Sequence, residues 1–319
     1  MRYTISIPLT TLLLANVALA EVPRVVTDIP PVHSLVSMVM GDLGSPDLLV
    51  DQGADAHSFQ LRPSQSVSLQ EANVIIWMGH AMTPWLERTL EGSATNATQI
   101  ELLNSPVTET QAYADDGAHD HSAEDAAAAT EPAPQTADEV EDHDPDGLDP
   151  HAWLDLHNAT AWLSLIAAEL SSLDPENAAT YAANAAAGAA QIGAVEEDIK
   201  TLLAPVAAKP FVVYHDAYGY FTGHFGLNIA GEIAVGDATS PSAAQLAALR
   251  DTLISGAPVC IFPEANHDPK LLIQIAEGTP VKIGGVLDPE GAALPPGAAL
   301  YTGLMRGLAT TLADCLTKS

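Results

Sequence analysis

The feature that most constrains the fold is an alanine-rich segment without an internal proline, which runs from Glu176 to Leu203. Alanine is the best helix former, and Asp174-Pro175-Glu176 has the pattern of an N-cap, a proline at the first helical position and an acid in the first turn. We therefore predict a helix over residues 174–204, roughly 45 Å long. Such a helix could join two lobes or lie inside a single domain, and its alanine faces would allow close packing on both sides.

Short apolar runs alternate with helical patterns on both sides of this segment, which predicts parallel sheets with right-handed crossovers. In the first half we expect strands at 24–27, 47–50 and 74–78 and helices at 33–40, 63–72 and 157–173. In the second half we expect strands at 211–214, 259–262 and 281–283 and helices at 242–255, 269–277 and 300–316. The fold class is therefore α/β, with an N-terminal lobe over residues 21–173 and a C-terminal lobe over residues 205–319. Each lobe is expected to hold a small, mainly parallel sheet flanked by helices.

The first twenty residues have the pattern of an export signal. Arg2 precedes a mostly apolar stretch, and Ala18-Leu19-Ala20 is an A-x-A cleavage site before Glu21. An uncleaved membrane anchor is the alternative, but the stretch is short for a membrane span and Pro8 interrupts it. We expect cleavage after Ala20 and export of the remaining chain without direct membrane insertion.

The chain has two cysteines, Cys260 and Cys315. In an oxidising compartment such a pair is expected to form a disulfide, with two buried free thiols as the alternative. The wide spacing and the lack of a CxxC pattern argue against a cysteine metal site.

The charge is strongly acidic, with a net value of −30 from 41 acidic and 11 basic residues. Nucleic acids and anionic membrane surfaces are therefore disfavoured as partners.

Residues 111–149 are rich in acid and alanine, lack lysine and arginine, and contain His119, His121 and His143. We predict a disordered insertion there. Its histidines are either weak accessory metal ligands or part of a solvated loop.

Three further histidines lie where a ligand site is expected. His57 follows the strand that ends at Val50, His151 opens the ordered region after the insertion, and His215 ends the strand that begins at Phe211. Ligands of open parallel sheets bind beyond the carboxyl ends of strands. The three imidazoles could therefore meet between the lobes and bind zinc. Taken singly, a histidine in a loop is more often a hydrogen-bonded surface group than a metal ligand.

The remaining histidines give weaker signals. For His33, His80 and His267, surface positions are expected in preference to the cleft. His157 and His224 have the surroundings of ordinary helix or turn residues.

The residues around the three candidate ligands resemble the ligand motifs of the metal-specific substrate-binding proteins of ABC importers, and among these the zinc-uptake members most. The matching segments are Gly53-x-x-x-His57-x-Phe59-x-Leu61-x-Pro63-Ser64, Asp149-Pro150-His151-x-Trp153-Leu154-Asp155 and Tyr214-His215-Asp216-Ala217-Tyr218-x-Tyr220-Phe221. The resemblance implies two four-stranded lobes joined by a rigid long helix. It also implies capture of Zn²⁺ between the lobes in the periplasm and delivery to an importer permease, without covalent chemistry.

Carried over residue by residue, the resemblance makes His57, His151 and His215 the metal ligands. Relatives that bind manganese usually have a glutamate where His215 stands, and an imidazole there favours zinc. Some zinc relatives have an acid where this chain has Ala56, which leaves the fourth ligand open. Asp288 matches an acid of the second lobe that binds metal in some members, and water is the alternative.

This interpretation implies two partners, the permease and a periplasmic zinc donor. We expect the chain itself to be a monomer. A zinc buffer or an adhesin on the same fold is the first alternative. A secreted zinc hydrolase is the second, but the chain has no HExxH motif and no obvious general base beside a ligand motif.

Overall fold

The computed structural model describes residues 21–92, 96–113, 147–234 and 241–318. The expected export signal lies outside these residues. So do residues 114–146 of the expected insertion, with His119, His121 and His143. The two ends of that insertion are described, and they form an antiparallel bridge between Ala112 and Leu148.

The first lobe contains a four-stranded parallel sheet in the order β2-β1-β3-β4. Its strands are β1 (Val25–Thr27), β2 (Asp47–Leu48), β3 (Val74–Trp77) and β4 (Thr98–Glu101). The sheet's inner face packs on α1 (Pro30–Met40), which a short 3-10 helix, η1 (Gly41–Leu43), follows. Its outer face packs on α2 (Pro63–Glu71) and α3 (Pro84–Gly92).

The second lobe repeats this strand order as β6-β5-β7-β8, and all its pairings are parallel. Its strands are β5 (Phe211–His215), β6 (Ile229–Ala234), β7 (Cys260–Ile261) and β8 (Lys282–Ile283). The outer face packs on α7 (Ala243–Ile254) and α8 (Lys270–Ala276). The inner face packs on α9 (Leu300–Thr317), and α6 (Gly219–Phe225) follows β5. The expectation of two four-stranded α/β lobes is confirmed.

Four elements lack the apolar signals that predicted the others. β4 and β6 are mostly half-buried or exposed, so neither shows a continuous apolar run. α3 and α6 have nine and seven residues, and each buries only two or three side chains. Short elements of this kind carry little periodic signal.

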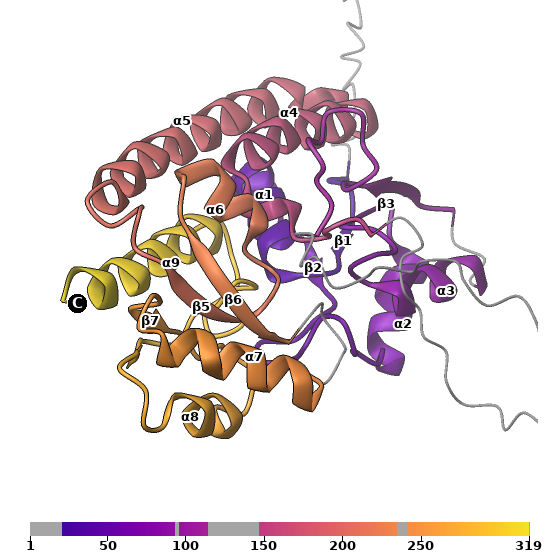
Figure 1. Ribbon diagram of the computed structural model, residues 1–319. Helices are drawn as coiled ribbons and strands as arrows, with labels where there is room; N and C mark the ends of the chain where they lie inside the picture. Colours follow the sequence, from indigo (N-terminus) through magenta and orange to yellow (C-terminus); the bar gives the residue numbers. More distant parts are fainter. Residues whose placement is uncertain (1–20, 93–95, 114–146, 235–240, 319) are drawn as a thin grey trace, which may run out of the picture.

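A helical layer joins the two lobes. Figure 1 shows α4 (Leu156–Leu173) and α5 (Ala178–Leu203) lying side by side, and a 3-10 turn, η3 (Pro175–Asn177), precedes α5. α5 contacts α1 and α4 from the first lobe and α9 from the second. Its buried side chains form one stripe at helical spacing: Tyr181, Ala185, Gly188, Ile192, Val195, Ile199 and Leu203.

The expected packing of this helix on both sides is therefore wrong, because most of its other alanines are exposed. The stripe belongs to a continuous apolar core that also contains Val25 of the first sheet and Phe211 of the second. The long helix thus joins two lobes and is also an internal helix of their common core.

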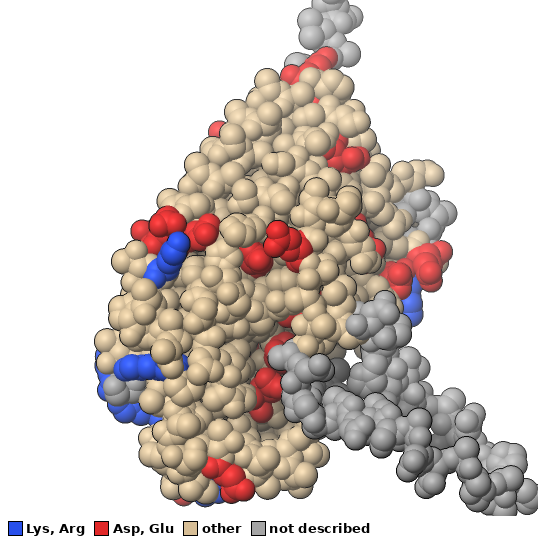
Figure 2. Space-filling model, turned by 45° about the horizontal axis from the view of Figure 1, so that its top comes forward, with Lys and Arg blue, Asp and Glu red and all other residues tan. Residues whose placement is uncertain are grey.

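The surface reflects the acidic composition. On the face drawn in Figure 2, Asp and Glu form several separate patches, while Lys and Arg are fewer. Among the described residues, no helix has both the length and the apolar character that a membrane crossing requires.

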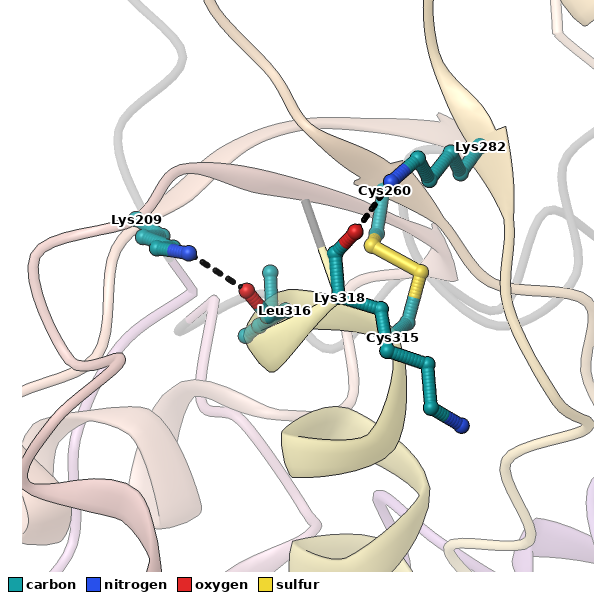
Figure 3. The surroundings of a disulfide bond; sticks show 6 residues. All are labelled: Lys209, Cys260, Lys282, Cys315, Leu316 and Lys318. Carbon is teal, nitrogen blue, oxygen red and sulfur yellow. Dashed lines mark hydrogen bonds between the residues drawn. A yellow bond between two sulfur atoms is a disulfide. The ribbon is translucent and has the colours of Figure 1, made fainter.

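The expected disulfide is present and joins Cys260 at the start of β7 to Cys315 in the last turn of α9. Figure 3 shows two lysines beside it that donate to carbonyl oxygens at the end of α9: Lys209 to Leu316 and Lys282 to Lys318. Positive charge at a helix C-terminus is favourable because the carbonyl dipoles point there. The cross-link and the lysines together fasten α9 to the second sheet.

Replacing both cysteines with serine should lower the free energy of unfolding by about 4 kcal/mol, because the bridge closes a long loop of the unfolded chain. The two cysteines are 55 positions apart. Chemical denaturation of the oxidised protein, the reduced protein and the double variant would measure the change. Reduced wild type separates the lost cross-link from the cost of a buried serine hydroxyl. A reduced protein as stable as the oxidised one would contradict the prediction.

Candidate metal centre

His57 lies in the loop between β2 and α2, and the loop's own polar groups define its shape. The Asp55 carboxylate accepts the backbone N–H of His57 at 2.9 Å and the hydroxyl of Ser58 at 2.6 Å. Trp85 of α3 donates its indole N–H to the carbonyl of Ala56. These contacts present a half-buried imidazole at the carboxyl end of the first sheet.

His151 follows the bridged ends of the insertion and precedes a 3-10 turn, η2 (Ala152–Leu154). It is fully buried, and its Nδ1 lies 2.8 Å from Oδ1 of Asp149. The same carboxylate oxygen accepts the backbone N–H of His151, and Gln111 donates to the other oxygen. A carboxylate on Nδ1 fixes the tautomer and ring orientation of a ligand histidine and directs Nε2 towards the metal.

His215 is the last residue of β5, the strand at which the order of the second sheet changes direction. Its Nδ1 lies 2.7 Å from Oε1 of Glu264, which follows the neighbouring strand β7. Tyr218 donates its hydroxyl to Oε2 of Glu264, and Nε2 of His267 lies 3.3 Å from Oε1. Burial alone would raise the pKa of Glu264, but His215 and these hydrogen bonds outweigh it and hold that pKa at about 2.

The three imidazoles meet at one point between the lobes. The ring centroids of His57 and His151 are 5.7 Å apart, and those of His151 and His215 are 5.4 Å apart. One nitrogen of each ring lies within 4.8 Å of the other two. Three imidazole nitrogens in this arrangement suit a tetrahedral zinc ion with one further position, once the rings approach to bonding distance.

Carboxylates surround the small pocket at this point. Asp55, Glu264, Asp288 and Glu290 line it together with His57, His215 and His267. Glu290 is buried, and burial raises its pKa to about 8, with the nearby charge of Asp55 adding to the shift. A buried acid that is costly to ionise is stabilised in its charged form by a cation. Sequence reasoning missed Glu290, for which the one available signal was its closeness to Asp288.

Asp288, which with water was one of two candidates for the fourth ligand, has a structural role. Its two carboxylate oxygens accept the backbone N–H groups of Ala292 and Ala293, each at 2.9 Å. This turn touches the first lobe, because Gly53 donates to the carbonyl of Ala292 and Trp153 donates to that of Pro289. Asp288 lines the pocket, but it is not a member of the three-histidine cluster.

Three histidines expected mainly at the surface have different surroundings. His33 is buried, with Nε2 3.2 Å from the carbonyl oxygen of Pro46, and burial lowers its pKa. His267 lines the pocket and stacks on Tyr214 with a centroid distance of 4.3 Å. The surface expectation is wrong for both. His80 is partly exposed and lies 2.5 Å from Glu87 of α3.

The comparisons with known proteins agree with this geometry. The family model described as "Zinc-uptake complex component A periplasmic" matches residues 25–315. A protein of Paracoccus denitrificans named "High-affinity zinc uptake system protein ZnuA" is 50% identical over 305 residues, which are 94% of this chain and 93% of that protein.

Two solved structures share the fold. A zinc-bound deletion mutant of ZnuA has a TM-score of 0.71 at 24% identity, and the match covers 92% of this chain and 98% of that one. The laminin-binding protein of Streptococcus agalactiae, described as bifunctional with adhesin and metal transporting activity, also has a TM-score of 0.71. It is 25% identical, and the match covers 92% of this chain and 99% of that one.

Glu264→Gln should lower metal affinity by about 10- to 100-fold, because the amide no longer provides a full negative charge at Nδ1 of His215. Competition with a chromogenic chelator would measure the change. Glu71→Gln is the matched control, since Glu71 forms an exposed ion pair with Arg24. Equal affinities for the two variants would show that Glu264 does not position the ligand.

Proposed function

This chain belongs to the family of periplasmic component A of zinc-uptake complexes, and on this premise we propose that it captures Zn²⁺ between its lobes and delivers it to the permease of an ABC importer. The observation that carries the proposal is the convergence of three imidazoles from two lobes on one point. A binding protein needs a site that holds its cargo through ligand bonds alone. Imidazole nitrogens do so for zinc without any covalent step.

The proposed ligands are His57, His151 and His215, with water in the fourth position. Water is preferred to Asp288 because both oxygens of that carboxylate already accept backbone hydrogen bonds. Three nitrogen donors favour zinc over manganese, which prefers oxygen ligands. The carboxylates around the pocket supply negative charge that offsets the charge of the ion.

We propose that the chain acts in the periplasm as a monomer, after cleavage of the export signal behind Ala20. The permease would be its membrane partner, and a periplasmic donor would be a source of zinc. Nucleic acid is not a proposed partner, since a net charge of −30 repels phosphate. No enzymatic activity is proposed. Growth rescue on low zinc that depends on the permease would separate uptake from buffering or adhesion.

The insertion is proposed to have an accessory role. His119, His121 and His143 would bind zinc weakly and raise its local concentration near the cleft. Replacing these three histidines should leave the tight site intact and remove the weaker zinc equivalents that the insertion supplies.

His215→Ala should weaken zinc binding far more than His143→Ala, because it removes a ligand from the tight site. The loss should exceed two orders of magnitude, because altering a residue that only supports a ligand already costs roughly 10- to 100-fold. Competitive chelator titration of the full chain would give both affinities. His80→Ala is a second control, since His80 pairs with Glu87 of α3. A tight site that survives in His215→Ala would reject the proposed ligand set.

Zinc affinity should fall as the pH drops below about 6.5, the pKa of a free imidazole, because only the neutral ring binds metal. A lower pH adds protons that compete with the ion, so the sign is a loss of affinity in acid. Chelator competition at about pH 5 and about pH 7.5 would measure the change. Equal affinities at the two values would count against imidazole ligands.

A further inference from the structure

A second group of metal-binding side chains lies outside the cleft, where three helices meet. Asp155 is the N-cap of α4, and His157 lies in the first turn of that helix. Glu196 comes from α5, and His224 comes from the end of α6. Figure 1 shows α6 beside the α4–α5 pair. The four side chains therefore come from α6 of the second lobe and from α4 and α5 of the joining layer.

Three of these side chains have the spacing of a metal site. Oδ1 of Asp155 lies 3.3 Å from Nδ1 of His224 and 3.9 Å from Nδ1 of His157. One ligand atom from each residue lies within 4.8 Å of the others, and the two ring centroids are 4.7 Å apart. Ligand atoms at the corners of a tetrahedral zinc site are about 3.4 Å apart, given bond lengths near 2.0–2.1 Å. A small movement of His157 would complete the geometry.

Glu196 occupies the position of a supporting carboxylate for both rings. Its Oε1 lies 3.1 Å from Nε2 of His224 and 3.9 Å from Nε2 of His157. If the Nδ1 atoms bind a metal, both Nε2–H groups can donate to this one carboxylate. Carboxylates in this position orient ligand histidines and increase their basicity.

The group has an open side. The His157 side chain is 65% exposed, whereas His224 is 9% and Asp155 is 15% exposed. An ion can thus reach the group from solvent past His157, and water can occupy a fourth position. The hydrogen bond from Asp155 raises the pKa of His224, followed by that from Glu196, although burial opposes the shift.

We propose that Asp155, His157 and His224 form a second zinc site, weaker than the cleft, in which Glu196 orients both imidazoles. Two nitrogens and one carboxylate oxygen suit a borderline divalent cation such as Zn²⁺. The bound ion would join α6 of the second lobe to α4. Both helices are close in sequence to the proposed cleft ligands. Only η2 separates Asp155 from His151, and His224 lies in α6, the helix that follows His215. The site would stiffen the interface that holds the cleft together.

Zinc titration of the full chain, with binding followed by calorimetry, tests the proposal. The background variant replaces His119, His121 and His143 with alanine, so that the insertion cannot supply weak equivalents. This background should keep one tight and one weaker equivalent, and adding His157→Ala should remove only the weaker one. His157 is exposed, so its loss should not prevent folding. Glu196→Gln should weaken the second equivalent by about 10- to 100-fold.

The matched control is His80→Ala, which removes another imidazole paired with a helix carboxylate but leaves this group unchanged. A second readout adds His151→Ala to the same background, so that the cleft site is disabled and the insertion histidines are absent. Zinc should still raise the melting temperature of this variant, and adding His157→Ala should abolish the rise. The proposal would be overturned by a weaker equivalent that persists when His157→Ala is added to the background variant, or by a thermal shift that persists when it is added to the variant with His151→Ala. The tight equivalent reports the cleft independently, so failure of one site is distinguishable from failure of the other.

Discussion

The buried stripe of α5 is the contact on which the rest of the structure depends. Tyr181 to Leu203 packs on α1 and α4 of one lobe and on α9 of the other, so both sheets share one apolar core. Separating the lobes as rigid bodies would expose that core to water, at about 25 cal/mol for each Å² of apolar surface. The spacing between ligands of the two lobes is therefore set by packing, and a metal site can be built across them.

Carboxylates refine the geometry that this packing makes possible. Asp149 holds Nδ1 of His151, and Glu264 holds Nδ1 of His215. Both carboxylates are themselves held, by Gln111 in the first case and by Tyr218 in the second. Each of these two buried imidazoles thus has a fixed orientation, which would reduce the entropy lost on binding an ion.

Much of this arrangement could be predicted from local sequence. Long apolar or alanine-rich segments predicted most strands and the joining helix. Strand ends indicated His57 and His215, whereas His151 was found where order resumes after the insertion. β4 and β6 could not be found in this way, because their side chains are mostly half-buried or exposed. The burial of His33 also escaped prediction, since it depends on the carbonyl of Pro46 beyond the end of its helix.

The supporting acids show a second limit of sequence reasoning. Glu264 is 49 positions from His215 along the chain, and the two meet because β5 and β7 are neighbours in the sheet. No local pattern gives that register. Asp288 was visible as a match to a family motif, but its hydrogen bonds to Ala292 and Ala293 depend on the fold of the turn. Motifs thus located the ligands, whereas the tertiary contacts defined what supports them.

The ligands differ in their freedom to move, and this bears on how an ion can be exchanged. His151 and His215 are buried and held by carboxylates, whereas His57 is half-buried in a loop. That loop is shaped by Asp55 and anchored by Trp85, and its Ala56 is buried in the shared apolar core against which Trp85 also packs. Displacing the loop would break a few hydrogen bonds, at about 0.5–1.5 kcal/mol each, and would also move Ala56 out of the core. His57 is therefore the least buried of the three imidazoles, although its loop is tied to the same core as the joining helix.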